Sequence, residues 1–382
     1  MMTSKERLLA AAQCQPVDYV PLAFHFWPHP RHPQAIWNND RERLAFYRAH
    51  EWDARVDIGA GVSPLPEVQV EVDFETRDDY TVLHQCWHTP AGTIEERLRV
   101  TDDWPGTRDS TNPVGFSDDF RTSRYLEFPF KTPQDLATLP YLFPLENPRD
   151  TEQIIQQHHD ARTLADEFEV PLFAYFSGGM DWLIWLYPAE EAVLRTQDEP
   201  EMVHALLNHI NAAFTTRLKT TLELGVDAVV RRGWYESADF WNPSMYTEFA
   251  CPALKQEIAL AHAAGTLFFY LMDTGIMPIL DQLAALPFDC LLGADPATSN
   301  QDLVTIRRAL PGKALWGGVS GPLHLGMGTP AEVEQVVEQA FATCGNTGFI
   351  LGSAVGYRYD WPWENLLAFE RAWKKGRART QG

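Results

Sequence analysis

The sequence predicts a mixed α/β protein built as a (β/α)₈ barrel of the TIM type, with an antiparallel hairpin insertion near residues 65–130. Short apolar runs such as 314–316 and 349–351 end abruptly in glycine-rich polar turns, which is typical of buried parallel strands. Eight such strands are expected, and helical patterns separate them. No GxGxxG motif opens a helix after an early strand, so the open doubly wound sheet is disfavoured.

The first part of the chain combines barrel elements with the insertion. Strands are expected over 18–27 and 53–61, with a helix over 41–50 between them. From about residue 65 the pattern changes to alternating apolar and polar residues broken by turns such as 89–92, which indicates hairpins. A helix follows over 131–139, because Thr132 is a suitable cap and Pro133 suits the first helical position.

After the insertion, strands and helices alternate again up to the end of one domain, 1–382. Asn242 is the expected cap of the helix that begins at residue 243. The remaining elements are strands over 170–179, 226–237, 266–275, 288–296, 314–321 and 348–356, and helices over 151–169, 183–223 (two patterns) and 243–264.

Composition excludes several function classes. The 382 residues hold 31 Lys and Arg against 52 Asp and Glu, a formal charge of −21, which repels nucleic acid. No apolar stretch approaches the roughly 20 residues that cross a bilayer, and the first residues lack the features of a signal peptide. Five scattered cysteines without a CxxC pair predict reduced thiols and a cytoplasmic protein.

Polar residues follow most of the expected strands, where the active site of a barrel lies. His25, Asp57, Glu236 and Asp273 are the catalytic candidates, although an Asp after a strand also serves as a helix cap. Substrate-binding candidates are the arginines, which can pair with an anion or with neighbouring acids, and the aromatic residues, which can line a pocket or pack loops. The full set is Arg232, Arg358, Trp182, Trp234, Tyr235, Tyr359, Ser320 and His324.

Several long stretches resemble the uroporphyrinogen decarboxylase superfamily. They are SKERLLAAAQCQPVDYVPL, ESADFWNPSMYTEFACPALKQEIALAHAAG, LWGGVSGPLHLGMGTPAEVEQVVEQA and GFILGSAVG followed by PWENLLAFERA. The resemblance covers most of the chain and implies a (β/α)₈ barrel. It implies no single reaction, because the superfamily includes porphyrinogen decarboxylases and zinc-dependent methyltransferases that exchange methyl groups with a corrinoid.

The motifs of both groups are altered here. The arginine-rich segment of the decarboxylases, RQAGRY, is replaced by HFWPHPRHPQAIW, in which Arg31 alone is a substitute. The zinc ligands of the methyltransferases, His-x-Cys and a later Cys, match Leu271, Asp273 and Val355. Leu and Val offer no ligand atom, so zinc is not expected at the usual site. Another ligand set, His25, Glu236 and Asp273, stays open, and no metal ligand is assigned.

The resemblance therefore favours a corrinoid-linked methyltransferase or demethylase that acts on a small organic substrate. The corrinoid would be carried by a separate protein, because no DxHxxG motif occurs in this chain. One alternative is a lyase that decarboxylates uroporphyrinogen or another carboxylated ring, and a second is a non-catalytic, ligand-binding barrel. A homodimer is also expected.

Overall fold

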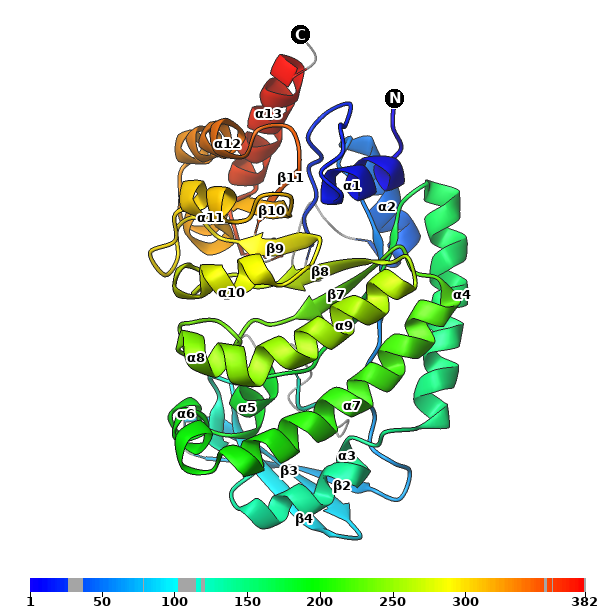
Figure 1. Ribbon diagram of the computed structural model, residues 1–382, viewed down its shortest axis with the longest axis vertical. Coiled ribbons are helices and arrows are strands. Elements are labelled where there is room, and N and C mark those ends of the chain that lie inside the picture. The colour runs from blue at the N-terminus through cyan, green and yellow to red at the C-terminus, as the bar shows by residue number, and fades with distance from the viewer. Residues whose placement is uncertain are drawn as a thin grey trace. The chain divides into compact units, whose positions relative to one another are not determined.

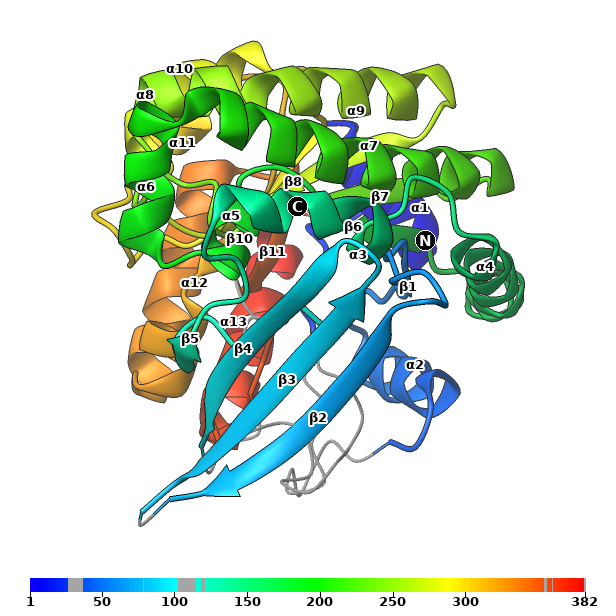
Figure 2. The ribbon, with the colours of Figure 1, turned by 90° about the horizontal axis from the view of Figure 1, so that it is seen from below.

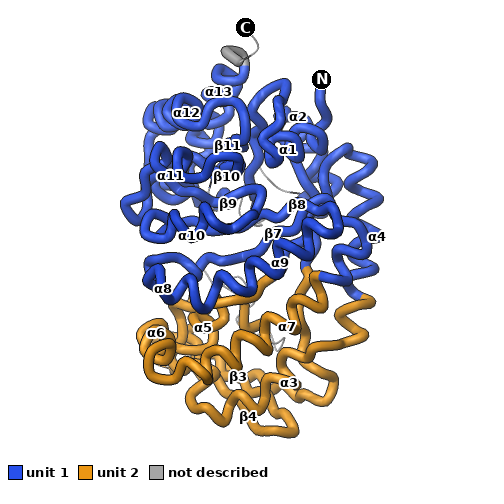
Figure 3. Tube along the Cα trace, viewed as in Figure 1, with its two compact units in different colours: residues 1–59, 153–176, 219–382 blue, residues 60–152, 177–218 orange. Residues whose placement is uncertain are grey.

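The computed structural model describes residues 1–26, 37–77, 79–101, 115–117, 121–353, 356–358 and 360–380. The chain divides into two compact units, which Figure 3 colours separately. Unit 1 comprises residues 1–59, 153–176 and 219–382, and unit 2 comprises residues 60–152 and 177–218.

Unit 1 is built on a seven-stranded parallel sheet in the order β1-β6-β7-β8-β9-β10-β11. Each strand pairs with the next strand of unit 1 along the chain, as expected for successive strand–helix–strand units (Figure 1). The mixed α/β class and the parallel sheet are thus confirmed. The strands are β1 Val56–Gly59, β6 Leu172–Phe176, β7 Ala228–Arg232, β8 Leu267–Leu271, β9 Cys290–Ala294, β10 Ala314–Val319 and β11 Phe349–Ser353.

The sheet curls around its own side chains. The ring of Phe173 in β6 lies 6.2 Å from that of Trp316 in β10, although three strands separate them in the sheet. Both rings belong to one core cluster with residues of β7, β8, β9 and β11. We call the sheet face that carries this cluster the interior face. Leu8 of helix α1 (Ser4–Ala12) packs against the same cluster.

Residues 18–26, where the first strand is expected, form an extended segment with isolated bridges and no regular strand. Leu22 bridges to Leu351, and Ala23 N–H donates to the Leu351 carbonyl over 2.9 Å. On its other side, the Leu22 carbonyl accepts from Asp53 N–H over 2.8 Å. Pro21 has no N–H to donate, which interrupts the ladder. Residue 27 lies outside the described residues.

The helices of unit 1 follow the expected alternation, and Asn242 caps α8 by accepting from Met245 N–H over 2.9 Å. The predicted helix 243–264 contains a π-helical turn, because Pro252 lacks an N–H and Cys251 N–H bonds to the Tyr246 carbonyl instead. The helices of unit 1 after α1 are α2 Asp40–Ala49, α8 Pro243–Met245, η2 Tyr246–Ala250, α9 Cys251–Ala263, η3 Met277–Ile279, α10 Leu280–Ala285, α11 Leu303–Ala309, η4 Gly321–Gly326, α12 Pro330–Cys344 and α13 Trp363–Thr380. Two long helices, α4 Pro148–Phe168 and α7 Pro200–Leu224, contain residues of both units.

Unit 2 contains an antiparallel sheet in the order β2-β3-β4-β5, which confirms the predicted hairpin insertion. Its three long strands lie side by side in Figure 2. Unit 2 extends beyond the predicted insertion, and the segment 131–139 is largely a 3₁₀ helix. Its elements are β2 Gln69–Thr76, β3 Thr81–Thr89, β4 Gly92–Val100, β5 Tyr125–Glu127, η1 Pro133–Thr138, α3 Leu139–Leu142, α5 Asp181–Leu186 and α6 Ala189–Asp198.

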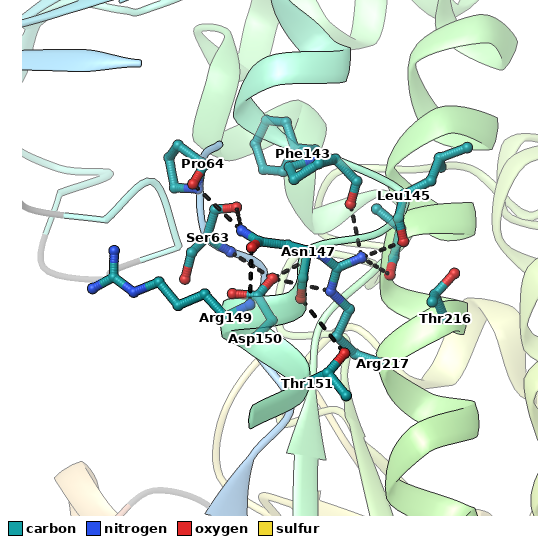
Figure 4. A network of polar contacts seen from close by, with 12 residues as sticks. Ser63, Pro64, Phe143, Leu145, Asn147, Arg149, Asp150, Thr151, Thr216 and Arg217 are labelled. Carbon is teal, nitrogen blue, oxygen red and sulfur yellow. Dashed lines mark hydrogen bonds and ion pairs between the residues drawn. The ribbon is translucent and has the colours of Figure 1, made fainter. Parts of the chain in front are cut away.

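A buried ion pair joins three segments of unit 2 (Figure 4). Nη2 of Arg217 in α7 lies 2.6 Å from Oδ2 of Asp150 in α4. The same carboxylate oxygen accepts from Ser63 N–H over 3.1 Å, and Arg217 Nη1 donates to the Pro144 carbonyl over 2.7 Å. Because both charges are buried, these hydrogen bonds are what makes the pair tolerable in the core.

The structure agrees with two expectations from composition. All five cysteines are among the described residues, and each is a free thiol. Within the described part of the chain, we find no helix whose length and apolar character would let it span a bilayer.

Candidate active site

A polar cluster lies on the interior face around Arg55. Its Nε donates to Oδ1 of Asp57 over 2.9 Å, and its Nη2 donates to the hydroxyl of Tyr175 over 2.9 Å. The guanidinium also lies 4.8 Å from the centre of the Trp316 ring. The guanidinium is buried, whereas the Asp57 side chain is 24% exposed. The three polar side chains therefore form a charged, partly accessible cluster beside an aromatic core.

His25 lies close enough to this cluster for its charges to act on the imidazole. Burial and, to a smaller extent, the positive charge of Arg55 lower the pKa of His25 to about 4, and Asp57 opposes the shift. The imidazole is therefore neutral at pH 7. Burial also raises the pKa of Tyr175 to about 12, so this phenol stays protonated.

Arg232, at the end of β7, lies on the same face, because the interior residue Val230 is two positions earlier. Its guanidinium lies 5.4 Å from the centre of the Trp234 ring, and Trp234 packs against the core cluster. The charge of Arg232 also lowers the pKa of Tyr175, which places it near the Arg55 cluster. The ring of Tyr235 packs edge to face against the ring of Phe240, with ring centres 5.6 Å apart.

Asp273 follows β8 in a loop, and hydrogen bonds to its backbone carbonyl hold this loop in place. The Asp273 carbonyl accepts from the Gln301 side-chain amide over 2.7 Å and from Asp295 N–H over 3.3 Å. A Cβ at Gly293 would stand 2.1 Å from Oδ1 of Asp273, so a side chain at this position would displace the carboxylate from its present place. The Asp273 side chain is half-buried, and the sequence resemblance matches this position to a cysteine ligand of the zinc-dependent methyltransferases.

Glu236 lies in a different cluster, which is fully buried. Its Oε1 accepts from Arg231 Nη2 over 2.9 Å, and its Oε2 accepts from the Tyr270 hydroxyl over 2.6 Å. Arg231 Nε also donates to Oε2 of Glu257 in α9 over 3.0 Å. Since Arg231 precedes Arg232 in β7, it points to the opposite face of the sheet, toward α9. We call these four residues the outer cluster.

Ser320 and His324 lie together after β10. The Ser320 hydroxyl hydrogen-bonds to Asp295, and Ser320 N–H donates to His324 Nδ1 over 3.1 Å. Burial raises the pKa of Asp295 and lowers that of His324. This group contains a neutral imidazole and a buried carboxyl, and Ser320 also caps η4 by accepting from Leu323 N–H.

The other candidates are dispersed. Arg358 Nε lies 3.6 Å from Oδ1 of Asp360, and both side chains are exposed. Tyr359 lies outside the described residues. Trp182 is buried within unit 2, where its ring packs 5.0 Å from Trp185.

Two residues of the interior cluster, Arg55 and Tyr175, were not predicted from the sequence. The signal for Arg55 was its spacing of two from Asp57, which places both on one face of a strand. Tyr175 is two positions after Phe173 in a strand that reads as uniformly apolar. A phenol in such a run is easily interpreted as core.

The residues at the family's zinc positions do not fit zinc. Leu271 is a buried apolar residue of the core cluster, and Val355 lies outside the described residues. The alternative set of His25, Glu236 and Asp273 is not brought together either: across the described residues these three form no group of metal-ligand atoms within 4.8 Å. We therefore derive no chemistry through zinc at this place.

The parallel sheet that curls around its own side chains places the chain in the class of α/β proteins built on barrel-like sheets. A family model described as Uroporphyrinogen decarboxylase (URO-D) matches residues 119–376, well over half of the chain. The chain therefore belongs to the uroporphyrinogen decarboxylase family, as its sequence resemblance indicated.

The solved structures that it resembles are distant in sequence. A methyltransferase from Methanosarcina mazei is 15% identical with a TM-score of 0.61, over 98% of this chain and 99% of that one, and so shares its fold. A B12-independent methionine synthase from Shewanella sp. W3-18-1, solved with selenomethionine, is 12% identical with a TM-score of 0.39, over 59% of this chain and 66% of that one. No curated protein matches the chain.

Proposed function

We propose that this member of the family is an enzyme that transfers a methyl group from a small organic substrate to a corrinoid carried by a separate protein. The observation that carries the proposal is the interior cluster of Arg55, Asp57 and Tyr175, with neutral His25 beside it. The fold that the chain shares with a protein titled methyltransferase gives independent support.

Substrate binding is assigned to Arg232 and Trp234. The guanidinium supplies a positive charge, and the indole next to it supplies a flat apolar surface. This pair suits a methylated molecule that also carries an anionic group. Arg358, which is exposed beside Asp360, is a second candidate for the anion.

The proton transfer to the substrate is assigned to Tyr175, and Asp273 is assigned as a second acid–base group. When the methyl group leaves, the substrate heteroatom takes up a proton, and Tyr175 holds one at neutral pH because its pKa is about 12. Arg55 fixes that hydroxyl at 2.9 Å, and Asp57 balances the arginine's charge. A reduced corrinoid, when bound on its partner protein, supplies the nucleophile that accepts the methyl group.

The test is methyl transfer by the purified protein from a panel of methylated aromatic and aliphatic acids to reduced cobalamin, followed by absorbance. We expect Asp273→Ala to lower the rate at least about 10²-fold, as for loss of an acid–base group, with an unchanged melting temperature. Asp281→Ala, an exposed aspartate after η3, is the matched control. Full turnover by Asp273→Ala would refute the assignment of this residue.

A decarboxylase is the second candidate, because Arg55 and Arg232 both face the interior and could bind substrate carboxylates. Asp57 would then contact ring N–H groups. Binding of porphyrins by the purified protein, followed by Soret absorbance, separates this function from methyl transfer. A protein that neither binds porphyrins nor transfers methyl groups, and whose melting temperature no small molecule raises, would favour the non-catalytic alternative.

The closure of the barrel and the oligomeric state belong to the same proposal. Residues 18–26 would occupy the eighth strand position of a closed barrel, since this segment bonds to β11 and to Asp53. The protein would act as a cytoplasmic homodimer. Light scattering at micromolar concentration tests the dimer.

A further inference from the structure

The antiparallel sheet of unit 2 has a polar face that the proposed function does not use. In β3, side chains alternate between a buried side and a half-buried side, and His84, Cys86 and His88 all lie on the half-buried side. In β4, Glu95 is directly opposite Cys86. Leu83 and Leu98, on the other side, form an apolar core. Metal-ligand side chains are thus gathered on one face of β3 and β4, two strands that lie side by side in Figure 2.

Three of these side chains meet at one point. His84 Nε2 lies 3.4 Å from Cys86 Sγ and 3.5 Å from Glu95 Oε2. The three ligand atoms all lie within 4.8 Å of one another. In the described part of the chain, this is the only such group of three histidine, cysteine or acidic residues.

These separations match those that a tetrahedral ion would impose. With bonds of ~2.3 Å to sulfur and ~2.0–2.1 Å to nitrogen and oxygen, tetrahedral angles place the ligand atoms roughly 3.5 Å apart. The two strands already hold the side chains at this spacing, so binding would need little rearrangement. A nitrogen, a thiolate and a carboxylate suit zinc far better than magnesium or calcium, which prefer oxygen ligands.

The fourth position also has a candidate ligand. Glu71 of β2 is opposite Cys86 on the other side of β3, and its side chain is 75% exposed. Its Oε2 lies 3.4 Å from His88 Nε2, within the same polar face. Because the carboxylate is exposed, it can turn toward the ion, or a water molecule can take its place.

The geometry points to a zinc site on the polar face of the antiparallel sheet, with His84, Cys86 and Glu95 as its ligands. The three ligands come from two neighbouring strands, so the ion would tie β3 to β4 and stabilise unit 2. Metal binding to the folded state alone raises the melting temperature. This inference does not depend on the proposed function, because it uses no residue of the interior cluster.

The test starts from the full-length protein stripped of metal with a chelator. Titration with Co²⁺ should reach one ion per chain and produce a thiolate-to-cobalt charge-transfer absorption, which Zn²⁺ then removes. The charge-transfer band should be absent in Cys86→Ser. Zinc affinity should fall in His84→Gln by more than the roughly 10- to 100-fold that loss of an outer ligand partner costs.

Matched controls are available in the same chain. Cys14→Ser removes another half-buried thiol, and His159→Gln removes an exposed imidazole of α4. Both should keep the band and the affinity. Glu95→Gln, at an exposed position, should weaken zinc binding without affecting folding in the presence of chelator. The inference is overturned if the stripped protein binds no Co²⁺ or Zn²⁺ at micromolar concentrations, or if the band survives in Cys86→Ser.

Elemental analysis separates this site from any metal at Asp273. Zinc that co-purifies with the wild-type protein should be lost in Cys86→Ser and kept in Asp273→Ala. The opposite pattern would place the metal at Asp273 and overturn the sheet site. Methyl transfer by Cys86→Ser should match the wild-type rate. A failure of the zinc-site proposal can therefore be distinguished from a failure of the proposed function.

Discussion

Two of the clusters of buried arginine and acid in unit 1, the outer cluster and the interior cluster, differ in what surrounds them. In the outer cluster, Arg231 bonds to Glu236 and Glu257, and all three side chains are almost completely inaccessible to solvent. On the interior face, Arg55 bonds to Asp57, which is 24% exposed, and to Tyr175. The comparison teaches that a sealed cluster whose members bond to one another serves stability, whereas a cluster with an accessible carboxylate is available to a ligand.

The largest effect should come from removing the cation of the outer cluster. Arg231→Met leaves Glu236 and Glu257 buried without their shared partner, which should lower the free energy of unfolding by about 3–5 kcal/mol. The measurement is denaturant unfolding followed by circular dichroism. Adding Glu257→Gln to Arg231→Met should recover part of the loss, because one uncompensated carboxylate is then removed.

An exposed ion pair provides the control for this substitution. Arg371 pairs with Glu334 over 3.0 Å at the surface, so Arg371→Met should change stability by less than about 1 kcal/mol. If Arg231→Met were equally mild, the outer cluster would contribute little to the fold, and its distinction from the interior cluster would fail.

A substitution on the interior face should have a smaller effect on stability, and its main effect should be on the methyl-transfer rate. Tyr175→Phe removes one hydroxyl bonded to Arg55, which should cost only about 1 kcal/mol of stability. The methyl-transfer rate should fall about 10²-fold, as expected for loss of a proton donor. The measurement is the pH–rate profile of the variant beside its unfolding curve.

Tyr246→Phe is the matched control, because the Tyr246 hydroxyl is also buried and lies 3.3 Å from the Tyr270 hydroxyl in the outer cluster. It should leave the rate unchanged. Equal losses of rate in both phenylalanine variants would mean that the interior position has no special role in the reaction.

The two arginines of β7 show how far the sequence can be interpreted. The pattern predicted a strand over 226–237, which contains Arg231, Arg232 and Glu236. It did not separate them, although consecutive residues of a strand point to opposite faces. Because Arg231 and Arg232 are adjacent in the strand, their side chains lie on opposite faces of the sheet and in different surroundings. Which face is the interior follows only from the curling of the whole sheet, since Phe173 and Trp316 meet across it.

Long-range contacts account for the rest of what the sequence left open. Arg55 bonds to Tyr175, 120 positions away, and no local pattern encodes that pairing. The parallel strands, in contrast, were predictable, because each is a short apolar run between helices. The segment at 18–26 was expected to be a regular strand, but Pro21 removes an N–H that the ladder needs.

The last expected effect is a pH dependence of stability that is specific to the outer cluster. Burial raises the pKa of Glu257 from 4.5 to about 7, although Arg231 opposes the shift. Between these pH values the folded state binds more protons than the unfolded chain, so the contribution of this carboxyl to stability is greatest below about pH 4.5 and is lost as the pH rises through about 7. From pH 5.5 to 8.5 the loss should be on the order of 2 kcal/mol.

Glu257→Gln removes this titration, because the amide stays neutral at every pH. Its free energy of unfolding should therefore fall less than that of the wild-type protein between pH 5.5 and 8.5, measured by urea unfolding at each pH. Glu223→Gln, an exposed glutamate of α7, should behave like the wild type. Parallel curves for Glu257→Gln and the wild type would show that Arg231 keeps this carboxylate ionised throughout, and the outer cluster would then be a fully charged triad that withstands burial through its hydrogen bonds alone.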